Sequence, residues 1–166
     1  MVAVEPSAAQ ARLALNLDAC IGCRSCAVAC FYGHQRLPIL RFARTGAVML
    51  PAVCRQCAEA PCVLACPSEA MIHDQDGTNY RATLRCTGCG SCAPACPFGV
   101  LSDEVFDGEI AKCDLCRDRL ADGLGPRCVA SCPTGALQFV QETEAAGLGL
   151  VVLGSRTLGQ HPIRRR

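Results

Sequence analysis

The sequence contains no tryptophan, and its other aromatic residues are limited to two tyrosines and five phenylalanines among 166 positions. A chain so poor in aromatic side chains cannot fill a large interior with them, and small domains short of apolar surface often use bound metal for stability instead. The formal net charge is only +1, so no excess of positive charge favours a nucleic-acid partner. The composition therefore argues against both a conventional aromatic core and a nucleic-acid-binding protein.

The sequence also lacks the segments that carry a chain to or across a membrane. Its start, MVAVEPSAAQARLALNLDAC, has neither a basic beginning with an apolar run nor a pair of adjacent arginines, as secretory leaders do. The longest apolar stretch near the end runs only from Leu148 to Leu153, whereas a membrane helix needs about 20 residues. These absences predict a cytoplasmic protein without a membrane span, in which cysteines stay reduced and free to bind metal.

Cysteine, in contrast, is abundant: all 16 cysteines fall into four groups of four. The third group reads CTGCGSCAPACP, with three thiols at two-residue gaps, a fourth three residues later, and then proline. This is the bacterial ferredoxin arrangement, in which three cysteines bind one 4Fe-4S cluster and the fourth binds its neighbour. The groups, called runs 1 to 4, are Cys20, Cys23, Cys26 and Cys30; Cys54, Cys57, Cys62 and Cys66; Cys86, Cys89, Cys92 and Cys96; and Cys113, Cys116, Cys128 and Cys132.

Two other chemistries of clustered cysteines fit this pattern less well. Disulfides suit secreted domains, and cysteines this close together in tight turns make poor disulfide partners because the bond geometry is restrictive. Structural zinc sites normally use two Cys-x2-Cys pairs separated by a longer segment, often with histidine, whereas in runs 1 and 3 a third cysteine follows at once. Sixteen thiolates at four per cluster thus predict four 4Fe-4S clusters.

The segments between the runs predict a small, loop-rich α+β fold. Residues 67–85 contain the Asp-Gly pair of a hairpin turn, so runs 2 and 3 can form one ferredoxin-like module. Residues 13–17 alternate in polarity before run 1, and residues 136–140 are mostly apolar after run 4. These two strands could pair in an antiparallel ladder and close an outer module around the inserted one. Spacing alone also allows the sequential alternative, which pairs run 1 with run 2 and run 3 with run 4.

The four runs resemble those of the four-cluster iron–sulfur subunits of the dimethyl sulfoxide reductase type, which serve formate dehydrogenase, hydrogenase and aldehyde oxidoreductase complexes. The fourth segment is the most specific, because Lys112 and the widened gap before Cys128 both belong to the family pattern. The resemblance covers residues 13–140 and implies the nested arrangement. The matching segments are CIGCRSCAVAC at 20–30, CRQCAEAPCVLACPSEAM at 54–71, CTGCGSCAPACPFG at 86–99 and KCDLCRDRLADGLGPRCVASCPTGAL at 112–137.

The nested arrangement predicts two bacterial-ferredoxin-like modules, one inserted in the other, and four ligand sets. The outer module comprises residues 13–53 and 112–142, the inserted module residues 54–111, and the C-terminal tail residues 143–166. The predicted sets are Cys20, Cys23, Cys26 and Cys132; Cys113, Cys116, Cys128 and Cys30; Cys54, Cys57, Cys62 and Cys96; and Cys86, Cys89, Cys92 and Cys66.

The sequence shows no nucleophile–base pair and no catalytic constellation. His34, His73 and His161 are scattered without a carboxylate partner at ligand spacing, and they are expected to be solvated or satisfied internally. Gly22, Gly88 and Gly99 are expected to permit close backbone approach to the clusters.

These features predict a non-catalytic electron-transfer subunit of an oxidoreductase complex. The resemblance implies a larger catalytic partner that holds a molybdenum or tungsten pterin, as in aldehyde or formate oxidoreductases, and a flavin subunit or a ferredoxin as a further partner. The alternative is a freely diffusing polyferredoxin that serves several enzymes.

Overall fold

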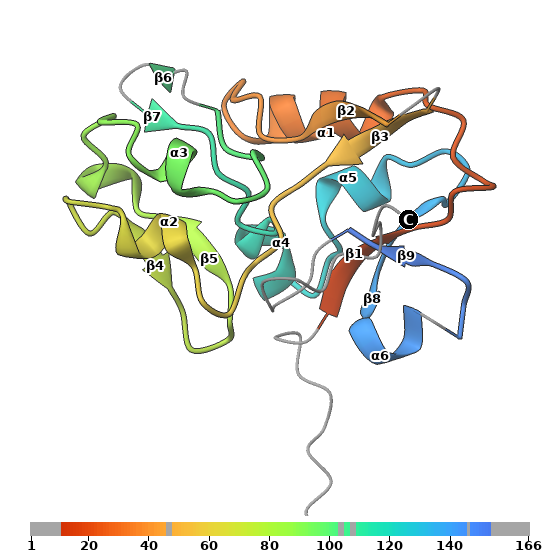
Figure 1. Cartoon of the computed structure of the whole chain (residues 1–166). Helices are drawn as coiled ribbons and strands as arrows, with labels where there is room; N and C mark the ends of the chain where they lie inside the picture. The colour runs from red at the N-terminus through yellow and green to blue at the C-terminus, as the bar shows by residue number, and fades with distance from the viewer. Residues whose placement is uncertain (1–10, 46–47, 103–104, 107–108, 146, 154–166) are drawn as a thin grey trace, which may run out of the picture.

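The computed structural model describes residues 11–45, 48–102, 105–106, 109–145 and 147–153. They form short helices and strands joined by long loops, in agreement with the predicted small, loop-rich mixture of both (Figure 1). No helix in these ranges is long and apolar enough to cross a membrane. The helices are α1 (Ser25–Gly33), α2 (Pro61–Leu64), α3 (Cys92–Ala95), α4 (Arg117–Ala121), α5 (Arg127–Ala130) and α6 (Glu142–Ala145), with a 3-10 turn η2 at Thr83–Arg85. The strands are β1 (Ala11–Leu15), β2 (Arg41–Thr45), β3 (Val48–Ala52), β4 (Met71–His73), β5 (Asn79–Arg81), β6 (Val105–Phe106), β7 (Glu109–Ile110), β8 (Leu137–Gln141) and β9 (Val151–Val152).

Strand β1 lies between β8 and β9 in a 3-stranded antiparallel sheet. Its register with β8 pairs Ala11 with Gln141 and Leu15 with Leu137. The predicted antiparallel ladder between the strand before run 1 and the strand after run 4 is thereby confirmed. Strand β9 comes from the segment predicted to be the C-terminal tail, and it covers the other edge of β1.

Strand β1 is buried along its whole length, although its alternating sequence predicted a half-buried strand. Leu13 and Leu15 belong to the main core cluster of the protein. Ala14, which alternation places on the opposite face, packs with Ala145 and Leu150 in a second cluster. The strand is therefore covered on both faces, because the segment after β8 folds back over it.

Strands β4 and β5 form the hairpin that the Asp76-Gly77 pair predicts. The turn is closed by two backbone hydrogen bonds of 2.9 Å: the Gly77 amide donates to the Asp74 carbonyl, and the Asp74 amide donates to the Thr78 carbonyl. Gly77 has a φ of 76°, a left-handed conformation that glycine adopts at little cost. The hairpin fixes the separation between runs 2 and 3.

Each run places its third cysteine in a short helix: Cys26 in α1, Cys62 in α2, Cys92 in α3 and Cys128 in α5. Helix α1 packs against α5, and α2 packs against α3. Figure 1 shows α2 and α3 beside β4 and β5 at one end of the molecule, with β1, β8 and β9 at the other. The helices thus bring run 1 to run 4 and run 2 to run 3. The insertion at 117–127 forms α4 and an exposed loop.

Candidate metal centres

The four runs share a backbone feature that the sequence only partly reveals. In every run the residue just before the second cysteine is left-handed: Gly22 has φ 66°, Gln56 49°, Gly88 66° and Leu115 61°. Such a residue makes a tight turn whose amide groups can line a concave, anion-binding surface. The two glycines were expected here, but Gln56 and Leu115 carry no sequence signal for this conformation. The first two thiols of each run therefore flank one repeated turn.

The first of two four-thiol cavities lies between runs 2 and 3. Its walls carry Cys54, Cys57 and Cys62 from run 2 together with Cys96, the last thiol of run 3. Apolar side chains form most of the remaining wall. Three polar residues also line it: Arg55, Asn79 and Lys112.

The second four-thiol cavity lies between runs 1 and 4. It is lined by Cys20, Cys23 and Cys26 from run 1 and by Cys132, the last thiol of run 4. Leu15 of β1 and residues of β2, β3 and β8 contribute to the same wall. The ladder of β1 with β8 therefore places two paired residues, Leu15 and Leu137, in the wall of this cavity.

Thiols of runs 1 and 4 interact electrostatically with Cys128 in α5. Burial raises the pKa of Cys128 to about 12, and the charges of Cys30 and Cys116 add to that effect. Burial likewise raises the pKa of Cys113, with the charge of Cys54 as the next cause. Cys30 of run 1 thus interacts with thiols of run 4.

Thiols of runs 2 and 3 interact electrostatically with Cys92 in α3. Burial raises the pKa of Cys92 to about 11. The charges of Cys62, Cys66 and Cys86 also raise it, by smaller amounts. The pKa of the exposed Cys89 is lowered, mainly by a hydrogen bond with the Ser91 side chain. The charge of Cys66 acts in the opposite direction and raises the pKa of Cys89. Cys66 of run 2 thus interacts with thiols of run 3.

These thiols fit a cationic metal cluster. Burial raises the pKa of Cys57 to about 11, and the charges of Cys54 and Cys62 raise it further. Several thiolates cannot share one apolar cavity without a cation, because each disfavours ionisation of the others. A metal reverses this effect, since a coordinating thiol is deprotonated. Four thiols around a small apolar cavity match the ligand requirement of a 4Fe-4S cluster.

Backbone amides donate hydrogen bonds to the sulfur atoms of the last cysteines of runs 2 and 4. The Ala70 amide donates to Cys66 Sγ at 3.2 Å, and the Leu137 amide donates to Cys132 Sγ at 3.4 Å. Both cysteines close their run and precede proline. Hydrogen bonds to ligand sulfurs orient the ligand and tune the reduction potential of a cluster.

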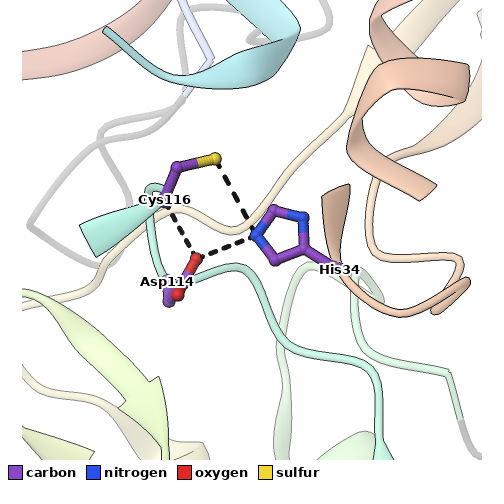
Figure 2. Close-up of side chains that lie close together, drawn as sticks. All are labelled: His34, Asp114 and Cys116. Atoms are coloured by element: carbon purple, nitrogen blue, oxygen red, sulfur yellow. Dashed lines mark hydrogen bonds and ion pairs between the residues drawn. The ribbon is translucent and has the colours of Figure 1, made fainter. Parts of the chain in front are cut away.

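His34 lies beside run 4, joined to two of its residues (Figure 2). Its Nε2 is 3.2 Å from Asp114 Oδ1 and 3.8 Å from Cys116 Sγ, and its Nδ1 is 2.8 Å from the Cys30 carbonyl oxygen. His34 is therefore satisfied internally, as expected, but its carboxylate partner could not be identified by spacing, because Asp114 is distant in sequence and only the fold brings it near. The hydrogen bond with Asp114 raises the pKa of His34 the most, and those with the thiols of Cys116 and Cys30 raise it further.

The histidines are otherwise satisfied as expected within the described ranges. The ligand atoms of His34, Asp114 and Cys116 lie within 4.8 Å of one another, but they already bond to one another, so they form a polar link between α1 and run 4. His73 Nδ1 lies 2.8 Å from Asn79 Oδ1. His161 falls outside the residues that the structure describes.

Replacing Gly22 by alanine is expected to lower the melting temperature by about 2–4 °C. Gly22 has a φ of 66°, and no protein atom lies within 4 Å of where a Cβ would be, so the expected cost within the protein is backbone strain of about 1 kcal/mol. Anaerobic thermal unfolding followed by circular dichroism measures the shift. Gly125→Ala is the matched control, because Gly125 also faces open space and has no left-handed φ. Equal shifts in the two variants would rule out strain as the cause.

Two family descriptions match the chain: a 4Fe-4S dicluster domain over residues 45–142 and a 4Fe-4S binding domain over residues 17–33. Together these ranges contain all four runs. Electron transport protein HydN of Escherichia coli K12 is 36% identical over 152 residues, which cover 75% of this chain and 85% of that protein. Thiosulfate reductase electron transfer subunit PhsB of Salmonella typhi is 38% identical over 134 residues, covering 72% and 70%. A tetrathionate reductase subunit of Salmonella typhimurium is 36% identical over 135 residues, covering 74% and 54%.

Proposed function

The chain belongs to the 4Fe-4S dicluster domain family, and we propose that it is an electron-transfer subunit that carries four 4Fe-4S clusters. A bound cluster of this kind takes up and releases an electron. The observation that carries the proposal is the distribution of 16 cysteines into sets of interacting thiols, two of which line cavities with four sulfurs each. The names of the relatives, an electron transport protein and reductase subunits, support a non-catalytic role.

The proposed clusters follow the nested arrangement. Its support is the packing of α1 with α5 and of α2 with α3, together with the ladder of β1 with β8. The outer module then comprises residues 13–53 and 112–142, and the inserted module residues 54–111. The proposed ligand sets are Cys20, Cys23, Cys26 and Cys132; Cys30, Cys113, Cys116 and Cys128; Cys54, Cys57, Cys62 and Cys96; and Cys66, Cys86, Cys89 and Cys92.

Exposed residues near two of the sets suit them to exchange electrons with partners. Cys23 and Cys89 are exposed, one in each proposed module. Ile21, beside Cys20, is 68% exposed, and Leu84, shortly before Cys86, is fully exposed. An exposed ligand sulfur lies close to a docked redox partner, and an apolar side chain beside it can add to the contact. We therefore place the entry and exit of electrons at run 1 and run 3.

The proposed partner is a larger catalytic subunit with a molybdenum or tungsten pterin, such as an aldehyde or formate oxidoreductase of the dimethyl sulfoxide reductase type. A flavin subunit or a ferredoxin would exchange electrons at the other end. The alternative is a freely diffusing polyferredoxin. A formal net charge of +1 gives little long-range attraction to many partners, which favours a stably bound subunit.

The test uses the anaerobically purified chain. It is expected to contain about 16 iron and 16 sulfide per chain, to accept electrons from a low-potential dye, and to convert no aldehyde or formate. Affinity purification from the cells that make it, with mass spectrometry, is expected to recover a larger oxidoreductase subunit. Turnover by the pure chain, or zinc in place of iron and sulfide, would contradict the proposal. A chain that elutes as a monomer without a partner would favour the diffusing polyferredoxin.

A further inference from the structure

Lys112 is a buried lysine whose charge the fold has to accommodate. Its side chain is 5% exposed, and an unpaired ammonium in such a place would be strongly destabilising. Its Nζ lies 3.0 Å from Cys54 Sγ, 2.6 Å from the Asn79 carbonyl oxygen and 3.0 Å from the Cys113 carbonyl oxygen. Two of these partners accept only, and the third is a sulfur that accepts when it is a thiolate.

Three acceptors around one nitrogen identify the form of this side chain. A neutral amine has two N–H bonds and a lone pair, whereas an ammonium has three N–H bonds and no acceptor. When Cys54 is an ionised cluster ligand, only the ammonium satisfies Cys54, Asn79 and Cys113 together. The contacts thus place a positive charge 3.0 Å from the sulfur of Cys54, on a side chain that is buried.

A buried polar network holds Lys112 in this position. The backbone amide of Asn79 donates to Gln56 Oε1 at 2.6 Å, and the side-chain Nδ2 of Asn79 donates to the Cys57 carbonyl at 2.7 Å. Gln56 Nε2 in turn donates to the Cys113 carbonyl at 3.1 Å. Gln56 and Asn79 are each 1% exposed. The network joins run 2, in the inserted segment, to run 4, so the ammonium cannot turn away without leaving buried groups unpaired.

We propose that Lys112 is a positioning residue that raises the reduction potential of the cluster bound by Cys54, Cys57, Cys62 and Cys96. Reduction adds negative charge to a cluster, and a nearby positive charge with an N–H···S hydrogen bond stabilises the reduced form. Low dielectric in the buried region strengthens the effect. The inference rests on the proposed function, because it takes the Cys54 set as a cluster site.

The experiment compares the anaerobically purified full chain with its Lys112→Met variant. Redox titrations monitored by electron paramagnetic resonance, with iron and sulfide counts, are run on both. At a fixed potential, the ratio of reduced to oxidised form is expected to fall at least tenfold for one cluster, equivalent to about 59 mV for a one-electron couple, and to stay unchanged for the others. Lys112→Arg, which keeps the charge, is expected to hold the ratio within about threefold.

Arg117→Met is the matched control for the loss of one positive charge. Arg117 also links the two segments, since its guanidinium lies 2.6 Å from Asp74 and 4.2 Å from the Tyr80 ring centroid, but these contacts involve no sulfur. For every cluster, its substitution is expected to change the ratio of reduced to oxidised form at a fixed potential by less than about twofold.

The possible outcomes separate this proposal from the proposed function. Four clusters with unchanged potentials in Lys112→Met would overturn the role of Lys112 and leave the electron-transfer function standing. A wild-type chain without iron and sulfide would overturn the proposed function itself. If the Met variant loads no iron, Lys112→Gln, which keeps N–H donors without charge, carries the test. If Gln also fails while Arg loads fully, Lys112 serves assembly and not potential, and the proposal is wrong.

Discussion

Replacing Cys30 and Cys116 together by alanine is expected to abolish one cluster, whereas replacing Cys30 and Cys57 together is expected to abolish two. In the nested arrangement Cys30 and Cys116 bind the same cluster, because the fourth cysteine of a run serves the neighbouring site. Cys30 and Cys57 then belong to different clusters. The first variant is expected to hold about 12 iron per chain and the second about 8, against about 16 in the unaltered protein.

The two double variants give opposite results under the sequential arrangement. There Cys30 would join Cys57 at one cluster, and Cys116 would lie at another, so the second variant would lose one cluster and the first would lose two. If each cluster were instead bound by the four cysteines of a single run, both variants would lose two clusters. Native mass spectrometry under anaerobic conditions counts clusters and also distinguishes a lost cluster from one that is short of an iron atom. The pair of variants therefore controls for the general damage caused by removing two thiols.

Removing all iron and sulfide is expected to unfold most of the chain. Cysteine side chains make up part of both larger core clusters, including Cys30, Cys128 and Cys92. Helices α2, α3 and α5 have only four residues each, and helices this short are not stable by themselves in water. Where a site exists only in the folded chain, the free energy of metal binding is free energy of folding.

Far-ultraviolet circular dichroism and amide hydrogen exchange measure this loss after the clusters are extracted anaerobically and the thiols are reduced again. Rebuilding the clusters with iron and sulfide is expected to restore the spectrum and the slow exchange of β1 and β8. Mock-treated protein that keeps its clusters is the control. An iron-free chain that still melted cooperatively, with β1 and β8 protected, would show that the apolar core suffices.

The parts of the fold that follow from local sequence could be predicted. The hairpin of β4 and β5 follows from Asp76-Gly77, and the pairing of β1 with β8 was inferred from the strands that flank runs 1 and 4. The grouping of cysteines into runs follows from spacing alone. In each case the signal is either a turn residue with a fixed conformation or an apolar pattern of short period.

The features that depend on distant contacts could not be predicted. Asp114 becomes the partner of His34 only when α1 meets run 4. Gln56 and Leu115 adopt left-handed conformations although neither is glycine, because their surroundings determine the turn. Lys112 stood out only as part of a resemblance, and its contact with Cys54 requires the inserted segment to fold against run 4. These features depend on tertiary packing, which overrides local preference.

The pairing of β1 with β8 also means that the first strand to be synthesised must wait for its partner until synthesis is nearly complete. A ribosome delivers β1 first, then both cysteine runs of the inserted segment, and only near the end the strand that β1 needs on its edge. Until then, the apolar strand around Leu13 and Leu15 has open edges on both sides, a state prone to aggregation. A nascent chain halted after the third run could thus complete the hairpin of β4 and β5 while its first strand still lacked a partner.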